Sequence, residues 1–158
     1  MATKKSYDWT QFKQLIFIRA NREKVYRAWT DEKMIVKWFT EKAVIEPRKG
    51  GRLYFEWIGG DKLETNVILA RKPSKFVFPF GGKSVEVAIS LSAAKGGTVV
   101  ELHQYNMSTA PKTRVSMHMG CKEGWAFFLT NLKAFLEHGI DLRGHDPRRC
   151  YVQGYVNS

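Results

Sequence analysis

The sequence predicts an α+β fold in which one face of an antiparallel sheet is covered by a long C-terminal helix. Three observations support this prediction: one long helical pattern near the C-terminus, a central region of alternating apolar and polar residues, and Gly-Gly pairs between the alternating runs. A helix with an apolar stripe and a sheet with one apolar face both need a surface to cover. We therefore expect the helix to pack across the sheet.

The long helix is predicted from Val115 to His138. Apolar side chains recur there at steps of three or four residues, which places them along one stripe of an α-helix roughly six turns long. The stripe comprises Met117, Cys121, Trp125, Phe128, Leu132 and Phe135. Gly139 follows it, and glycine readily ends a helix in a left-handed conformation.

One strand and two short helices are expected ahead of the sheet region. Residues 11–19 have the composition of a strand, and their apolar side chains fall on both faces, which predicts burial on both sides. Asn21 is a suitable N-cap for one short helix. Thr30 or Asp31 is suitable for a second helix that runs through Phe39.

Residues 43–106 have the pattern of an antiparallel meander. Gly-Gly pairs occur at 50–51, 59–60, 81–82 and 96–97, and glycine supplies the positive φ values that tight hairpins need. Apolar and polar residues alternate between the pairs, which predicts strands at residues 52–58, 62–70, 75–80, 83–93 and 98–106. Only one side of these strands is apolar, so we expect the other face of the sheet to be exposed.

Length and composition are those of one domain. The 158 residues are enough to bury a substantial core, which we place at about residues 10–142, with a C-terminal extension at 143–158. Four apolar residues indicate that the extension folds back on the domain: Tyr151, Val152, Tyr155 and Val156. With two cysteines, Cys121 and Cys150, we expect no disulfide framework and a reducing cytoplasm as the compartment. No apolar run approaches the length of a membrane span.

The chain is strongly basic, with 26 Lys or Arg against 15 Asp or Glu and a formal net charge of +11. The basic residues are spread along the sequence, and no motif for reading nucleic acid accompanies them. We therefore interpret the charge as a solvated basic surface without specific nucleic-acid binding. An acidic protein partner or an anionic ligand is compatible with such a surface.

The order of elements and several short motifs together resemble a known group. The motifs are Ile18-Arg19-Ala20, Trp29-Thr30-Asp31, Lys37-Trp38-Phe39, Gly50-Gly51, Gly124-Trp125 and Leu136-Glu137. Over about residues 12–142 the chain resembles the Bet v 1/START superfamily (SRPBCC), and within it the branch of homologues of the activator of heat-shock-protein-90 ATPase. The resemblance implies a helix-grip fold, in which a curved antiparallel sheet wraps around the C-terminal helix.

A sheet that curves around one helix leaves a hollow beside the helix unless large side chains fill it. The candidate ligand-binding residues are mostly large and aromatic, with a few softer or polar ones: Trp38, Phe55, Trp57, Phe78, Phe80, Gln104, Met117, Cys121, Trp125 and Phe128. Ligand pockets are typically apolar, with a few polar groups that orient the ligand. The alternative is that these aromatic residues fill the space as core, and the sequence leaves both interpretations open.

The sequence offers little for catalysis. His118 and Cys121 are three residues apart on the helix, the minimum for an activated thiol or half a zinc site, but no further ligand stands at a suitable spacing. By strand parity, Gln104 occupies the inward position at which members of the resembled family often have a histidine, while His103 points to solvent. We therefore expect no metal, no cofactor and no catalytic residue.

Three functions remain after these exclusions. The sequence favours a protein that binds a small hydrophobic or aromatic ligand between sheet and helix, without catalysis. The resemblance implies a second function, a protein-interaction module for a chaperone or an acidic partner. A third, implied by other members of the superfamily, is a cyclase or hydrolase that uses the same cavity. Fold alone does not decide among them.

Overall fold

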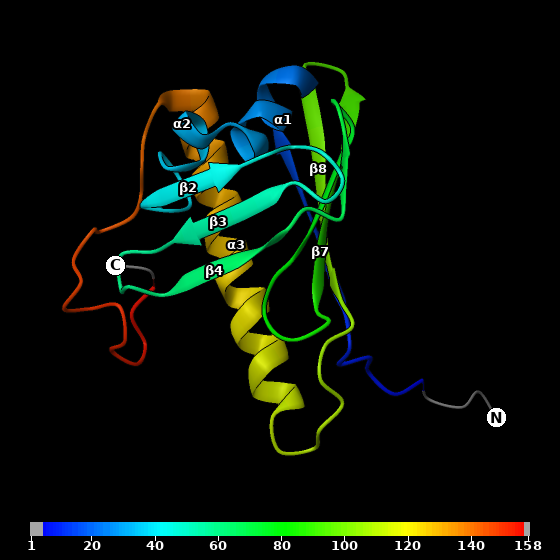
Figure 1. Cartoon of the computed structure of the whole chain (residues 1–158), viewed down its shortest axis with the longest axis vertical. Coiled ribbons are helices and arrows are strands. Elements are labelled where there is room, and N and C mark those ends of the chain that lie inside the picture. The colour runs from blue at the N-terminus through cyan, green and yellow to red at the C-terminus, as the bar shows by residue number, and fades with distance from the viewer. Residues whose placement is uncertain (1–4, 157–158) are drawn as a thin grey trace.

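The computed structural model describes residues 5–156, so residues 1–4 and 157–158 of the predicted domain lie outside the described part. The elements follow the predicted order of one strand, two short helices, a run of strands and a long helix (Figure 1). The helices are α1 (Arg22–Thr30), α2 (Glu32–Ile35) and α3 (Arg114–His138). The strands are β1 (Phe12–Ile18), β2 (Lys42–Ile45), β3 (Arg52–Glu56), β4 (Lys62–Asn66), β5 (Leu69–Arg71), β6 (Lys75–Pro79), β7 (Glu86–Ala94) and β8 (Gly97–Tyr105).

Across the described residues the strands form two antiparallel sheets. One has five strands in the order β1-β8-β7-β6-β5, and the other has three strands in the order β2-β3-β4. Figure 1 shows α3 running past both sheets, with α1 and α2 gathered at one end of the molecule. The prediction of an α+β helix-grip fold is confirmed.

The predicted strand at residues 62–70 is divided between the two sheets. Val67 N donates to Gly51 O at 2.8 Å, next to β3, whereas Ile68 N donates to Val77 O at 2.9 Å, in β6. The chain therefore leaves one sheet and joins the other between adjacent residues, which lets the two sheets curve around α3. The alternation of apolar residues does not reveal this change of partner, because it continues across the break.

β1 is covered on one side only, so the prediction that it is buried on both faces was wrong. Phe12 and Ile18 are buried, but Leu15 is 65% exposed and Phe17 is 37% exposed. The physical reason is that α3 packs against the inner face of this strand, while no other described element covers its outer face. Isolated apolar side chains on a protein surface are common, and strand composition alone does not distinguish them from core residues.

Side-chain caps begin both short helices. Asn21 Oδ1 accepts a hydrogen bond from Lys24 N at 2.8 Å, and Asp31 Oδ1 accepts one from Lys33 N at 2.9 Å. The second helix is shorter than predicted, since α2 ends before Phe39 and turns follow it. These turns place the ring of Phe39 in the core, where it is 1% exposed.

α3 ends at Gly139 as predicted, in a left-handed conformation with φ of 68°. Gly139 N donates to Phe135 O at 2.8 Å, which satisfies one of the last carbonyl groups of the helix. The stripe that faces the sheets is buried at Trp125, Leu129, Leu132 and Leu136. α3 therefore supplies one wall of the core.

A buried histidine ties the N-terminal segment to α3. His118 is fully buried, with Nδ1 3.0 Å from Trp9 O and Nε2 2.8 Å from Tyr7 Oη. Both ring nitrogens are thereby engaged. His118 is therefore not positioned to activate Cys121, although the two residues are only three apart on the helix.

A buried asparagine joins three segments near the other end of α3. Asn131 Nδ2 donates to Trp38 O at 2.7 Å and to Asp141 Oδ1 at 3.0 Å. Asn131 Oδ1 accepts from Leu142 N at 2.7 Å. One fully buried side chain thus holds the turns after α2 and the start of the C-terminal segment against α3.

Replacing Asn131 measures how much its hydrogen bonds contribute to the free energy of unfolding. Asn131→Ala leaves Trp38 O and Leu142 N without their buried partner, and each unsatisfied group costs about 1–3 kcal/mol. We expect the free energy of unfolding in urea to fall by roughly 2–4 kcal/mol. Thr130→Ala, at the exposed neighbouring position, is the control and should change it by less than about 0.5 kcal/mol. A loss below about 1 kcal/mol for Asn131→Ala would contradict this role.

Candidate functional site

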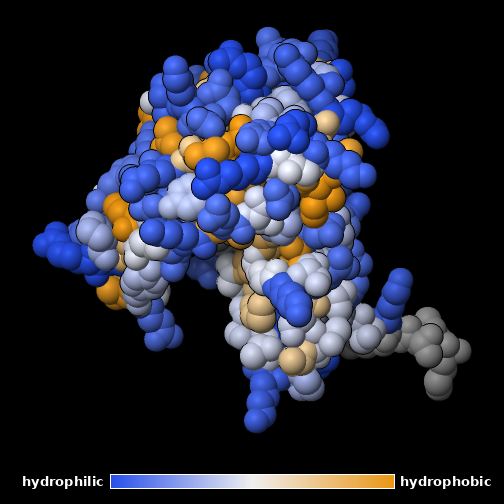
Figure 2. Space-filling view, in the orientation of Figure 1, coloured by the Kyte–Doolittle hydropathy of each residue, from blue (hydrophilic) through white to orange (hydrophobic). Residues whose placement is uncertain are grey.

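A groove of about 450 Å³ lies between α3, the turn from β3 to β4, and the C-terminal segment that follows α3. Figure 2 shows the surface hollowed between that C-terminal segment and the N-terminal half of α3. The turns after α2 supply the remaining lining residues. The groove is thus built from four segments that are far apart in the sequence.

Aromatic side chains form the floor of the groove and continue into the core. The ring centroid of Phe39 is 5.4 Å from that of Trp57 and 4.7 Å from that of Phe128, and both pairs meet edge to face. Phe39 also stacks on the buried ring of Trp125 at 5.2 Å. Such pairs contribute about 0.5–1.5 kcal/mol beyond the burial of their area. The floor is therefore held in place by the core beneath it.

Two glycines leave the α3 side of the groove open. Gly120 and Gly124 are one helical turn apart and both line the groove. A Cβ atom built at either position would meet no atom within 4 Å. Close packing among the described residues therefore does not require glycine there. What the glycines provide is space, through which a bound molecule can approach the helix backbone.

Arg143 anchors the C-terminal segment that forms the outer wall. Its side chain is 6% exposed and donates to two backbone carbonyls in the turns after α2, at 2.8 and 3.1 Å. It also pairs with Asp141 at 2.8 Å. His145 continues the network, with Nε2 2.7 Å from Asp141 Oδ2 and Nδ1 3.0 Å from Glu41 Oε1.

Tyr151 holds the far end of the same segment against the turn from β3 to β4. Tyr151 Oη donates to Gly59 O at 2.8 Å. A Cβ atom at Gly59 would lie 2.5 Å from that hydroxyl oxygen, so the contact requires glycine at this position. The described part of the extension, residues 143–156, therefore folds back over the domain, while residues 157–158 lie outside the described part.

Electrostatic interactions fix the charge state of this wall. Burial alone raises the pKa of Asp141, but hydrogen bonds from Arg143, Asn131 and His145 outweigh it and hold that pKa well below its usual range. Burial, together with the nearby carboxylate of Asp61, raises the pKa of Tyr151, so its hydroxyl stays protonated and able to donate to Gly59.

Two of the predicted ligand-binding residues, Trp57 and Phe128, line the groove. Trp38, Phe55 and Phe78 are fully buried and pack against other aromatic rings of the core. Their large side chains therefore fill much of the space that the sequence left open as either pocket or core. A role for these three in ligand contact stays a prediction.

The remaining predicted site residues gather around Gln104, with Phe80 packed on Trp125 at a centroid distance of 5.0 Å. Gln104 Oε1 accepts from Trp125 Nε1 at 2.8 Å. Gln104 Nε2 is fully buried and has no hydrogen-bond partner of good geometry among the described residues. Burial raises the pKa of the neighbouring Cys121 thiol, an effect that Gln104 opposes. Met117 lies nearby, next to the turn between β6 and β7. A ligand-binding role for this cluster stays a prediction, and the raised pKa of Cys121 disfavours a thiolate there.

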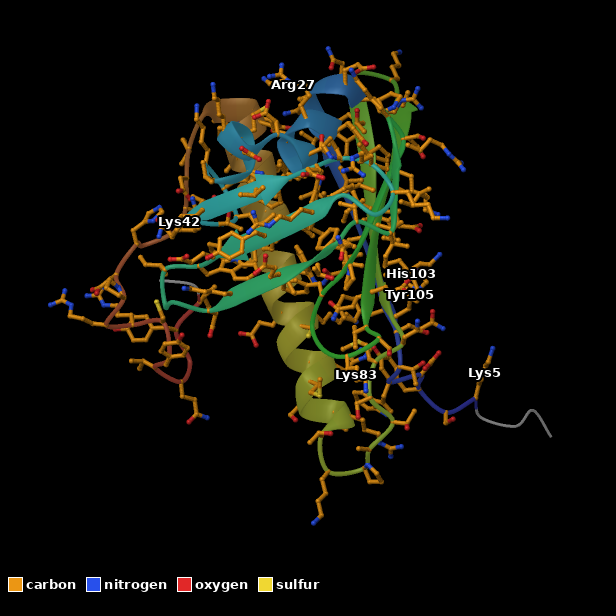
Figure 3. All side chains as sticks on the ribbon, in the orientation of Figure 1. Lys5, Arg27, Lys42, Lys83, His103 and Tyr105 are labelled. Atoms are coloured by element: carbon orange, nitrogen blue, oxygen red, sulfur yellow. The ribbon has the colours of Figure 1, made fainter. Side chains whose placement is uncertain are left out.

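The opposite face of β8 is polar, as strand parity predicts. Figure 3 shows His103 and Tyr105 pointing away from α3. His103 Nε2 lies 2.8 Å from Gln11 Oε1, and Tyr105 Oη donates to Glu86. Burial and that hydrogen bond raise the pKa of Tyr105 to about 12. These side chains are remote from the groove and take no part in its chemistry.

Sequence reasoning missed several residues of the groove, and only some of them carried a signal. Gly120 and Gly124 lie one turn apart within the long helical pattern, and this spacing could have predicted a helix face without side chains. Tyr151 and Tyr155 are among the residues that predict a folded-back tail. The contact of Tyr151 with Gly59 could not be read from the sequence, because no local pattern links residues so far apart.

Neither a cluster of metal-ligating side chains nor a membrane-spanning helix occurs among residues 5–156. Within residues 5–156, no group of three or more His, Cys, Asp or Glu side chains is arranged to hold a metal ion. None of the helices in this part of the chain combines the length and the apolar character needed to cross a bilayer.

Comparison with known proteins places these features in a family. The family model described as "Activator of Hsp90 ATPase homolog 1-like protein" matches residues 19–137, which run from the end of β1 to the last turn of α3. No curated protein matches the sequence significantly.

Solved structures share the fold at low sequence identity. A Staphylococcus saprophyticus protein is 23% identical with a TM-score of 0.75, and the match covers 84% of this chain and 96% of that protein. The Aha1 protein of Colwellia psychrerythraea, described as a dimer in solution, is 24% identical with a TM-score of 0.69, over 82% of this chain and 97% of that one. DynU16, from the dynemicin biosynthetic locus, is 18% identical with a TM-score of 0.69, over 82% of this chain and 48% of that one.

The low pKa of Asp141 makes the stability of the fold depend on pH. Its folded-state pKa lies below the value of about 3.9 in an unfolded chain, so the ionised carboxylate favours the folded state. This contribution is fully present above roughly pH 5 and is lost as the pH falls toward the folded-state pKa. We expect Asp141→Asn to reduce the drop in free energy of unfolding between pH 6 and pH 3, measured by urea titration. Glu64→Gln, an exposed carboxylate on β4, is the control, and an equal drop in both variants would contradict the assignment.

Proposed function

The chain belongs to the family of activator of Hsp90 ATPase homolog 1-like proteins, and from that premise we propose that it binds a small ligand with an apolar or aromatic body in the groove beside α3. One observation carries the proposal: an open groove of about 450 Å³ has an aromatic floor and a helix wall in which two lining residues, Gly120 and Gly124, have no side chain. The site binds its ligand without chemistry of its own.

The size and lining of the groove support a ligand of modest dimensions. Pockets for small molecules typically measure about 300–1,000 Å³ and combine apolar walls with a few polar groups. Here the rings of Trp57, Phe127 and Phe128 offer apolar surface, and Arg143 and His145 stand at the rim. Trp57, Phe127 and Phe128 are all partly exposed, so a ligand would remove apolar surface from water, which is the main source of affinity in such sites.

The chemistry of the groove favours binding over catalysis. Arg143 is engaged by backbone carbonyls and Asp141, and His145 lies between two carboxylates. These contacts hold the wall of the groove in place. The thiol of Cys121 is kept protonated by burial.

A protein-interaction function is the second candidate, and the surface charge favours it. The net charge of +11 would attract an acidic partner such as a chaperone domain, and the family description refers to activation of the Hsp90 ATPase. The exposed apolar residues Leu15 and Phe17 on β1 would add contact area. Such a partner would dock on the sheet face and leave the groove accessible.

Filling the groove from α3 provides a direct test of ligand binding. N-phenyl-1-naphthylamine, a neutral fluorescent probe of apolar sites, is titrated into the protein. We expect its fluorescence to rise on binding, and Gly124→Leu to weaken the affinity at least 10-fold, because the new side chain occupies the groove. Ala126→Leu adds the same side chain at an exposed position of α3 outside the groove and should leave the affinity unchanged.

The thermal stability of the variants separates blocked binding from damage to the fold. Leucine has a higher helix propensity than glycine by about 0.8–1 kcal/mol, so Gly124→Leu should be at least as stable as the parent protein. If Gly124→Leu binds the probe as tightly as the parent protein does, or if the parent protein gives no signal, the groove is not the binding site that we propose.

A further inference from the structure

We infer that the ligand of this groove carries a positive charge beside its apolar body; the inference rests on the proposed function and specifies the class of ligand. The groove has more acidic than basic residues in its lining, in a protein whose overall charge is +11. Glu41, Asp61 and Glu123 line it, and Arg143 is the one lysine or arginine among the described lining residues.

The positive groups at the rim are already matched by negative ones. Arg143 pairs with Asp141 at 2.8 Å and lies 3.8 Å from Glu41. His145 lies between the same two carboxylates, 2.7 Å from Asp141 and 3.0 Å from Glu41. These four side chains form one network, in which the guanidinium of Arg143 is paired with the carboxylate of Asp141. The guanidinium of Arg143 is therefore not available to an anionic ligand.

Two carboxylates of the lining stand outside that network. Asp61 belongs to the turn between β3 and β4, and Glu123 belongs to α3, so they approach the groove from different walls. Within residues 5–156 neither forms an ion pair with a lysine, arginine or histidine. Both are exposed, and although Asp61 lies beside the hydroxyl of Tyr151, both carboxylates are open to an ammonium group.

The aromatic lining suits the same kind of ligand. Trp57 and Tyr151 line the groove, and the negative face of an aromatic ring attracts a cation. The chain itself illustrates the interaction, since the guanidinium carbon of Arg149 lies 5.6 Å from the centroid of the Tyr155 ring. Aromatic rings combined with unpaired carboxylates form a recurrent environment for organic ammonium ions.

The net charge of the protein does not override this local arrangement. Screening by salt limits long-range attraction to a distance of about 8 Å at physiological ionic strength. Within that range the lining presents Asp61 and Glu123 beside the paired Arg143, while Arg149 is held over the Tyr155 ring at the edge of the groove. The basic surface therefore acts on acidic macromolecules outside the groove, whereas the groove selects by its own charges.

Three ligands that share one ring system test the inference. They are 1-naphthylmethylamine, which is cationic at neutral pH, 1-naphthalenemethanol, which is neutral, and 1-naphthoic acid, which is anionic. Affinities are measured by isothermal titration calorimetry at pH 7 and 0.15 M salt. We expect the amine to bind at least 10-fold more tightly than the alcohol, and the acid to bind most weakly.

A double variant assigns the preference to the two unpaired carboxylates. Asp61→Asn with Glu123→Gln should reduce the affinity for the amine to that for the alcohol and leave the alcohol unchanged. The control is Glu64→Gln with Glu101→Gln, which removes the same charge at two positions outside the groove and should preserve the preference. Glu123→Gln alone, at an exposed helix position, provides an intermediate case that does not alter the turn at Asp61.

The outcomes distinguish this inference from the proposed function. If none of the three ligands binds, the proposed function fails. If all three bind equally, or if the acid binds most tightly, the groove binds ligands but the inference of a cationic ligand is overturned. If the double variant keeps the preference for the amine, the assignment to Asp61 and Glu123 is overturned.

Discussion

The packing of Phe39 is the interaction on which both the core and the groove depend. Its ring, 1% exposed, meets aromatic rings from the preceding turn, the strands and α3, namely Trp38, Phe55, Trp57, Phe80, Trp125 and Phe128. Interiors are close-packed, so one large side chain at such a junction sets the spacing of all the elements around it. Phe39 thereby holds α3 at a fixed distance from the sheets and also forms part of the groove floor.

Hydrogen bonds, rather than apolar burial, position the outer wall of the groove. Tyr151 and Tyr155 are 69% and 56% exposed, so their burial stabilises the C-terminal segment only weakly. The segment is instead held by Asn131 and Arg143, whose buried polar atoms bind backbone carbonyls of the turns after α2. Buried polar groups with full sets of partners specify one geometry, because any shift leaves a group unsatisfied. A well-defined groove follows from this even though its wall lacks a core of its own.

The parts of the fold that the sequence predicted are those encoded by local signals. The stripe of α3, the glycine that ends it, the N-caps Asn21 and Asp31 and the Gly-Gly turns all act over a few residues. The division of residues 62–70 between two sheets and the exposure of Leu15 depend on which distant segment packs nearby. The same holds for the site. Strand and helix periodicity predicted that Trp57 and Phe128 face the space between sheet and helix, but no local pattern predicted the wall that the C-terminal segment provides.

Gly120 and Gly124 give the strongest reason to regard the groove as more than a gap left by packing. Each glycine inside a helix costs about 1 kcal/mol relative to alanine, and that cost is usually offset where a neighbouring backbone must approach closely. A Cβ atom at either position would have no neighbour within 4 Å, so no approach of the described chain offsets the cost. The unused space lies inside the groove, whose lining also includes Tyr151 and Glu123. Glycine at these two positions lowers the stability of α3 and leaves space in the groove. A ligand that occupies this space would explain why the helix has glycine there.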